Sequence, residues 1–177
     1  MLETVLATER LRAVPFRQDD LPLMEALHAD PEVNRYLGTA AAWDKATVRR
    51  KLDKFITDQE RHGFSKWKIL TRDGEFVGRA GFTPYDETSE IEMGYSFMRA
   101  HWGKGYATEI SRALTRWFFD KTYYTHLIGF CRTDHRASRR VLEKAGLTYR
   151  ETRSIKGMPC DVYQILSPAM QKLVSNA

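Results

Sequence analysis

The sequence predicts a single α/β domain built around a mixed sheet. After one strand and two helices, three strand-like runs follow, and helical and strand-like segments then alternate towards the end of the chain, which is the order expected for helices packed on one sheet. The chain has 177 residues, of which 42% are hydrophobic and 29% charged, as in ordinary globular proteins. No internal repeat, low-complexity tract or Pro/Gly-rich linker interrupts it. We therefore expect residues 1–177 to form one domain.

The first third of the chain predicts one strand and two helices. The mostly apolar run of residues 11–16 predicts a first strand, and Asp19 or Asp20 supplies an N-cap for the helix that follows. Residues 30–31, Asp-Pro, end that helix. A second helix is expected over residues 44–62, because its apolar side chains recur with helical spacing and a C-capping glycine follows: Val48, Leu52, Phe55, Ile56 and Gly63.

The middle and end of the chain predict the rest of the sheet. A short antiparallel meander is expected from three strand-like runs, at residues 64–71, 75–83 and 90–98. Helical spacing of apolar residues then predicts a core helix over residues 106–119. The remaining elements are a strand, a helix and two strands, at residues 126–132, 136–144, 149–155 and 160–166.

The charge of the chain permits a polyanionic ligand without singling out nucleic acid. Lys and Arg number 28 against 23 Asp and Glu, a formal charge of +5. The densest basic cluster, residues 132–140, surrounds a motif described below. A coenzyme with three phosphates explains that cluster as well as a nucleic acid does, and we expect no nucleic-acid partner.

The start of the chain, its apolar runs and its two cysteines indicate where the protein is located and whether it binds a metal. The first thirty residues lack the features of a secretion signal, and no apolar run approaches the roughly 20 residues of a membrane-spanning helix. We expect a cytoplasmic protein without a membrane partner. Cys131 and Cys160 lie in predicted strands without the paired spacing of a zinc site or disulfide framework, so we expect two reduced, buried thiols and no bound metal.

A glycine-rich loop precedes the predicted core helix. Residues 102–109 read Trp-Gly-Lys-Gly-Tyr-Ala-Thr-Glu. Gly103 and Gly105 carry no Cβ that would block a ligand, and the loop can direct backbone N–H groups towards an anion at the positive end of the helix dipole. A pyrophosphate fits such a site. The alternative is an ordinary tight turn, since two glycines before a helix are common.

A second motif follows the predicted strand 126–132. Residues 133–147 include Ala-Ser at 137–138 and Val-Leu-Glu-Lys-Ala-Gly-Leu at 141–147. Together with the loop at 102–109, about 25 residues earlier, this segment resembles the GNAT superfamily of N-acetyltransferases. Within that superfamily it is similar to the RimJ and RimL branch, which acetylates the N-termini of ribosomal proteins.

Further matches extend the resemblance over nearly the whole chain. They are Thr-Glu-Arg-Leu-Arg at 8–12, Phe-Val-Gly at 76–78 and Glu-Met-Gly-Tyr at 92–95, all in the family's order. The resemblance implies a GNAT fold, with a mixed, mostly antiparallel seven-stranded sheet, a splay between its two central parallel strands, and flanking helices. It also implies acetyl-coenzyme A as co-substrate.

The resemblance places the coenzyme on two segments. Backbone amides from Gly103 to Ala107 are expected to hold the pyrophosphate, although Trp102 departs from the family's Gln or Arg. The strand from Tyr95 is expected to pair with the pantetheine arm, and His135 replaces a family Asn near the splay. The expected coenzyme-binding residues are Phe97, Met98, Arg99, Trp102, Gly103, Lys104, Gly105, Tyr106, Ala107, Thr108, His135 and Ser138.

Amine acetylation needs a neutral amine and a proton for the departing thiolate. The resemblance places a family Glu at Glu92, while Glu90, two residues earlier, points to the same strand face. Either could act as a base through water. Alternatively, Glu92 only orders the amine, because a peptide α-amine with a pKa near 8 needs less help than an alkyl amine with a pKa of about 10.

Many superfamily members use a tyrosine on the second helix to protonate the thiolate, but Leu142 stands at that position. In the branch this chain resembles, the serine of Ala-Ser is the proposed donor, which corresponds to Ser138. Ser138 lies four residues before Leu142 and therefore on the same helical face. The alternative role for Ser138 is a hydrogen bond to the helix N-terminus or to the coenzyme.

The acceptor amine is the least specified part of the prediction. A protein N-terminus leads by resemblance, while a polyamine, an aminoglycoside or an amino-acid-like metabolite remain open. Two alternatives belong to other classes: a module that binds acetyl-coenzyme A without turnover, and a basic nucleic-acid-binding domain. A homodimer is also compatible with the sequence.

Overall fold

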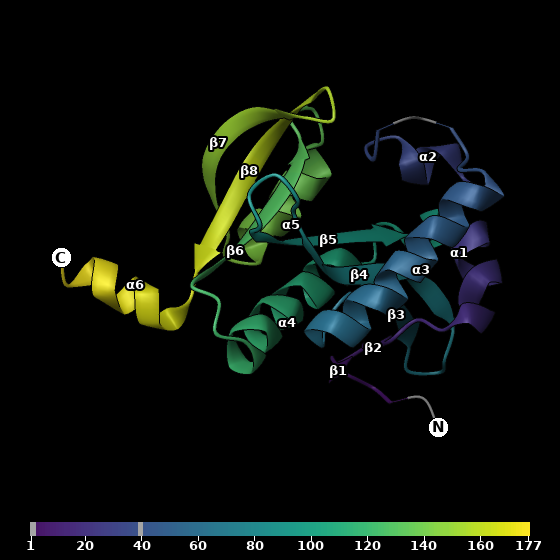
Figure 1. The fold of residues 1–177 in the computed structure, drawn as a ribbon, viewed down its shortest axis with the longest axis horizontal. Helices are drawn as coiled ribbons and strands as arrows, with labels where there is room; N and C mark the ends of the chain where they lie inside the picture. Colours follow the sequence, from purple (N-terminus) through teal and green to yellow (C-terminus); the bar gives the residue numbers. More distant parts are fainter. Residues whose placement is uncertain (1–2, 39–40) are drawn as a thin grey trace.

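One eight-stranded sheet forms the centre of the molecule (Figure 1). The structure is a computed structural model that describes residues 3–38 and 41–177. The spatial order is β1-β2-β3-β4-β5-β6-β8-β7, and neighbours are antiparallel except for β5 and β6. The strands are β1 (Leu6–Ala7), β2 (Leu11–Val14), β3 (Lys66–Thr71), β4 (Phe76–Pro84), β5 (Ile91–Phe97), β6 (His126–Arg132), β7 (Thr148–Ile155) and β8 (Met158–Leu166).

Helices flank the sheet at the positions that the sequence predicts, and α2, α6 and two 3-10 turns occur in addition. Two short 3-10 turns occur at Gln18–Asp20 and Arg99–His101. The α-helices are α1 (Leu21–His28), α2 (Pro31–Asn34), α3 (Lys45–His62), α4 (Tyr106–Lys121), α5 (Arg136–Lys144) and α6 (Pro168–Ser175). In the part of the chain that the structure describes, no helix is long and apolar enough to cross a membrane.

The predicted mixed, mostly antiparallel sheet is confirmed, with one strand more than the seven expected. The addition is β1, whose two residues pair with β2 at the sheet edge. Gly63 caps the end of α3 as predicted, with a left-handed φ of 74°, and Asp44, expected as the first helical residue, is the N-cap whose carboxylate accepts from Thr47 N–H. Cys131 and Cys160 are buried free thiols, as expected.

Asp20 is the N-cap residue of α1, as predicted, although its side chain does not cap the helix. The carboxylate accepts instead from Arg17 N–H and pairs with Lys68, whose Nζ lies 2.8 Å from both carboxylate oxygens. A buried carboxylate binds an ammonium group more strongly than a neutral N–H, which explains why Asp20 pairs with Lys68 and does not cap α1.

The two faces of the central strands differ in chemistry. On one face the apolar side chains of β3, β4 and β5 pack against α4 in the main core, as with Trp67, Phe82 and Phe118. Strand alternation turns Lys66 and Lys68 of β3 to the opposite face, beside polar residues of β4 and β5. Helices α1 and α3 cover that polar face through a second apolar cluster.

Strands β5 and β6 pair only briefly before they part. Their parallel pairing is recorded at Glu92 opposite Ile128, and no further register pair joins them among the described residues. Strand β6 then continues alongside β8 over its whole length. The sheet therefore opens beside the second half of β5, which is the splay that the sequence predicts.

Candidate active site

The loop between β5 and α4 presents a row of backbone N–H groups. Gly103 and Gly105 both have left-handed backbones, with φ of 74° and 80°, which glycine adopts at little cost. In the described part of the chain, no protein acceptor binds the N–H groups from Gly103 to Thr108; the first bonded amide is Glu109 N–H, to Gly105 C=O. Six adjacent donors at the positive end of a 16-residue helix form a cradle for a pyrophosphate.

The N-terminal segment holds this loop in place. The Glu109 carboxylate accepts from Thr8 Oγ1 at 2.7 Å and from Arg10 Nε at 2.6 Å. The Arg10 guanidinium also donates to Lys104 C=O and lies 4.7 Å from the centre of the Tyr106 ring. Residues 8–10, Thr-Glu-Arg, therefore fix the position of residues 103–108, which we call the anion loop.

The backbone of the second half of β5 lines the opening between β5 and β6. Met98 N–H donates to Val77 C=O of β4, so alternation turns the N–H and C=O of Phe97 towards the opening. The indole of Trp102 donates to that carbonyl at 2.9 Å and is half exposed. The Phe97 side chain is buried in the main core. The strand therefore offers an extended ligand the Phe97 amide, whereas its carbonyl is already bonded to Trp102.

Two of the expected coenzyme residues are engaged elsewhere. The Arg99 guanidinium forms a double hydrogen bond with Asp30, which also caps α2, and so ties the end of β5 to the α1–α2 connection. His135 stacks on Tyr36 with ring centres 3.7 Å apart. Burial lowers the pKa of His135, which favours the neutral ring. Both residues thus link the opening to the α2 region.

Glu92 lies on the polar face of the sheet beside a buried lysine. Its Oε2 is 3.3 Å from Lys66 Nζ, which also donates to Gly81 C=O. A Cβ on Gly94 would lie 2.5 Å from Glu92 Oε1 and 2.7 Å from Lys66 Nζ, so the glycine makes room for the pair. Burial lowers the pKa of Lys66 to about 8, although Glu92 opposes the shift.

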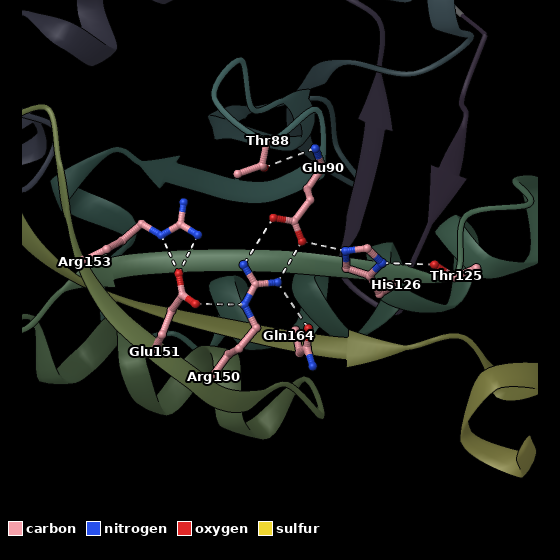
Figure 2. A network of polar contacts seen from close by, with 8 residues as sticks. All are labelled: Thr88, Glu90, Thr125, His126, Arg150, Glu151, Arg153 and Gln164. Carbon is pink, nitrogen blue, oxygen red and sulfur yellow. Dashed lines mark hydrogen bonds and ion pairs between the residues drawn. The ribbon is translucent and has the colours of Figure 1, made fainter. Parts of the chain in front are cut away.

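Glu90, the residue before β5, belongs to a network with residues of β6, β7 and β8 (Figure 2). Its carboxylate accepts from Arg150 Nη1 at 2.7 Å and lies 2.6 Å from His126 Nε2. Arg150 in turn contacts Gln164 and Glu151. The hydrogen bond from Arg150 is the main cause that lowers the pKa of Glu90 to about 2. A carboxylate of such low basicity that is already bonded to Arg150 and His126 is poorly suited to accept a proton.

The network predicts a measurable contribution of Glu90 to acid stability. Because the folded-state pKa is depressed, the stabilisation is complete above the unfolded-state value of about 4.3 and is lost as the pH falls towards 2. We expect Glu90→Gln to lower the free energy of unfolding by about 2 kcal/mol at pH 7, and the deficit to shrink below pH 4.5. Urea unfolding between pH 2.5 and 7 measures it. An equal deficit at every pH would contradict the network, and the exposed Glu60→Gln is the control.

Tyr95 and Ser138 meet on the face opposite Glu92. Tyr95 follows Glu92 by three residues, so alternation places the two side chains on opposite faces of β5. The Tyr95 hydroxyl lies 3.0 Å from Ser138 Oγ in the first turn of α5. Burial raises the pKa of Tyr95 to about 12. Leu142, where many superfamily members have tyrosine, is buried, and a Cβ on Gly129 would lie 2.8 Å from its Cδ2.

The structure thus brings most, but not all, of the expected residues around one opening. The anion loop, Phe97 and Ser138 surround it, and Glu92 lies on its other face. Sequence reasoning missed Lys66 and the hydroxyl of Tyr95. The signals were present: lysine at alternate positions of a core strand, and a tyrosine placed three residues after Glu92. No cluster of three His, Cys, Asp or Glu suited to a metal occurs among residues 3–38 and 41–177.

An anion loop at a helix N-terminus beside an opened pair of parallel strands defines a coenzyme-dependent acyltransferase. The chain belongs to the GNAT acetyltransferase family, because the family described as "Acetyltransferase (GNAT) domain" matches residues 10–148. It is therefore an acetyl-coenzyme A-dependent acyltransferase.

Individual relatives share the whole length of the chain. The uncharacterized protein YkkB of Bacillus subtilis is 31% identical over 166 residues, which cover 92% of this chain and 95% of YkkB. An acetyltransferase structure from Agrobacterium tumefaciens superposes with a TM-score of 0.80 at 26% identity, covering 93% and 95% of the two chains. RimL, a ribosomal L7/L12 α-N-protein acetyltransferase crystallised with coenzyme A, superposes with a TM-score of 0.78 at 17% identity, covering 94% and 99%.

Proposed function

We propose that this enzyme transfers the acetyl group of acetyl-coenzyme A directly to a primary amine, with Glu92 receiving the amine proton and the Tyr95–Ser138 pair supplying a proton to the departing sulfur. One observation carries the proposal. The carboxylate and the hydroxyl pair lie on opposite faces of β5, beside the place where this strand parts from β6. A reaction in that opening would have a proton acceptor on one side and a proton donor on the other.

The residues present fit acetyl-coenzyme A. The six free amides from Gly103 to Thr108 suit its pyrophosphate, and the Phe97 amide suits a pantetheine carbonyl. When bound, the coenzyme supplies the electrophilic carbonyl of its thioester. Direct transfer is favoured because Cys131 and Cys160 are buried and burial raises the pKa of both thiols, which leaves them poor nucleophiles.

Contacts hold the Glu92 carboxylate in place while 15% of its side chain stays exposed. The Lys66 ammonium and the space above Gly94 fix the carboxylate on the face covered by α1 and α3. A neutral amine donates one hydrogen to this carboxylate, directly or through a water molecule, as the nitrogen attacks. Lys66 acts as a positioning residue in this scheme.

The acceptor is a primary amine, and a protein N-terminal α-amine is the leading candidate through the resemblance to the RimJ and RimL branch. That assignment rests on motifs shared with the branch and on the fold shared with RimL. Small-molecule amines remain the alternative. A panel of peptides, polyamines, aminoglycosides and amino acids, screened by release of the coenzyme A thiol, separates these classes.

Tyr95 provides a direct test of the proton donor. Since its pKa is raised to about 12, the hydroxyl stays protonated throughout the working pH range and can donate. We expect Tyr95→Phe to lower kcat by about 10- to 100-fold with little change in the KM for acetyl-coenzyme A. Steady-state thiol release measures both constants.

Two further variants complete that test. Ser138→Ala should lower kcat less, by about 3- to 10-fold, because it removes only the partner of the tyrosine. Tyr123→Phe is the matched control, since that side chain is fully exposed. Wild-type kcat in Tyr95→Phe would exclude the tyrosine as donor. A protein that binds acetyl-coenzyme A but acetylates no amine would support a binding module instead.

A further inference from the structure

The polar face of β3, β4 and β5 carries more positive than negative charge. The register places Lys68 beside Arg79 and Arg79 beside Ser96, next to the row formed by Lys66, Gly81 and Gly94. Lys66, Lys68 and Arg79 are all more than nine-tenths buried. Buried charges of this kind are costly unless they are paired.

Two of these cations have carboxylate partners and one has none. Lys68 is paired with Asp20, and Lys66 with Glu92. Among residues 3–38 and 41–177, no carboxylate lies within ion-pair distance of Arg79; its Nε donates to the neutral Nε2 of His28 at 3.1 Å. Burial lowers the pKa of Arg79 to about 10, which still leaves it charged at neutral pH.

Arg79 is held rigidly despite lacking an anionic partner. His28 accepts from Arg79 Nε on one ring nitrogen, and its Nδ1 lies 2.7 Å from Asn34 Oδ1. Burial lowers the pKa of His28 to about 3, so the ring remains neutral and can accept the bond. His28 also stacks on Trp43, with ring centres 3.9 Å apart. The guanidinium is thus oriented by a chain of contacts that neutralises none of its charge.

Lys51 of α3 adds a second cation without a carboxylate partner. Its Nζ lies 5.8 Å from the centre of the Trp43 ring, the ring that also packs on His28. The side chain is half-buried, and no carboxylate in the described part of the chain lies within ion-pair distance of it. Burial, followed by the charges of Lys156 and Arg79, lowers the pKa of Lys51. Lys51 and Arg79 therefore face the same electropositive region.

We infer that Arg79 and Lys51 form an anion-binding subsite beside Glu92, and that the acceptor amine carries a carboxylate or phosphate a few bonds from its nitrogen. This inference rests on the proposed function, because it assigns the acceptor to the face of β5 on which Glu92 lies, and within that function it favours the small-molecule alternative over a protein N-terminus. The Glu92 carboxylate lies over Gly94, whose register row is next to that of Arg79, and same-face rows on a strand are about 7 Å apart. An amine at the Glu92 carboxylate therefore places an anion over the Arg79 row only if the molecule is compact. A polycation would be repelled.

The test compares amines that differ in charge. Thiol release is measured with O-phosphoethanolamine against ethanolamine, with β-alanine against β-alaninamide, and with spermidine. In parallel, calorimetry measures binding of O-phosphoethanolamine and β-alanine to the protein saturated with coenzyme A, so that the phosphate loop is already filled. The variants are Lys51→Gln and Arg79→Lys, and Lys45→Gln, an exposed position on the same helix, is the control.

If the subsite exists, the anionic amine of at least one pair has a kcat/KM about tenfold higher, or more, than its uncharged counterpart. Comparing O-phosphoethanolamine with β-alanine then shows whether the subsite prefers phosphate or carboxylate. Lys51→Gln should lower the preference for the anionic amine and the calorimetric affinity by about tenfold, mainly through KM, with the uncharged amine unaffected. Equal use of both members, preference for spermidine, or unchanged anion binding in Lys51→Gln would overturn the inference. Acetyl transfer to uncharged amines would still uphold the proposed function, whereas anion binding without any transfer would overturn that function alone.

Discussion

Replacing Gly105 by glutamate is expected to abolish binding of acetyl-coenzyme A. Gly105 is the N-cap of α4 and has a φ of 80°, and its neighbours present free amides to the anion site. A carboxylate there would occupy the place of the pyrophosphate and repel it. We expect the Kd to rise by about 100-fold or more. Isothermal titration calorimetry with acetyl-coenzyme A measures the effect.

The matched control is Gly105→Gln. Glutamine has the same size and imposes the same strain on a left-handed backbone, but it carries no charge. A Cβ at this position meets only Arg10, at 3.4 Å, so the loop has room for either side chain. The glutamine variant should therefore bind at least tenfold more tightly than the glutamate variant. Similar affinity of both variants would show that the backbone, not charge repulsion, causes the loss.

Replacing Glu92 by glutamine should remove most of the turnover while leaving coenzyme binding intact. The amide keeps the shape of the side chain above Gly94 but cannot accept a proton. General-base catalysis contributes about 100- to 10,000-fold, and an acceptor α-amine that is already partly neutral needs less, so we expect kcat to fall by about 100-fold. Stopped-assay thiol release with the best acceptor amine measures it.

The same variant separates catalysis from positioning. If Glu92 acts as the base, activity in Glu92→Gln should recover as the pH rises, because more of the amine is then neutral without help. Glu60→Gln, an exposed substitution on α3, should behave as the wild type. A wild-type kcat and pH profile in Glu92→Gln would assign Glu92 to a structural pair with Lys66.

The sequence predicts the secondary structure closely where local signals are strong. The ranges expected for β6 and α5 agree with the structure, as does the C-cap of α3 at Gly63. Strand β1 could not be predicted, because two residues carry no periodicity and its pairing depends on β2. Helix α6 was also missed, although the signals were present: it begins at Pro168 after a capping Ser167, and Met170, Leu173 and Val174 recur with helical spacing.

The polar face of the sheet shows why the site was harder to predict than the fold. The sequence Lys66-Trp67-Lys68-Ile69 alternates polar and apolar residues, which indicates a strand with one solvated face. Helices α1 and α3 cover that face instead, so both lysines are buried with carboxylates from distant segments. Alternation gives the direction of a side chain, but only tertiary packing decides what covers it.

Long-range pairs account for the other missed contacts. The bond between Tyr95 and Ser138 spans 43 positions of the chain, and Arg99 meets Asp30 across 69. No local pattern encodes such pairs. The resemblance to GNAT enzymes predicted Ser138 as a proton donor, and that role remains a prediction that the Tyr95 and Ser138 variants test.

The most direct test of the central proposal is transfer itself. Purified protein is incubated with acetyl-coenzyme A and each amine of the panel, and released thiol and acetylated product are quantified in the same sample, with intact-protein mass recorded alongside. We predict equal amounts of free thiol and N-acetyl product for one class of amine, with no acetylated enzyme. No product with any amine despite coenzyme binding, or an acetylated protein that forms first and passes its acetyl group on, would contradict direct transfer at Glu92.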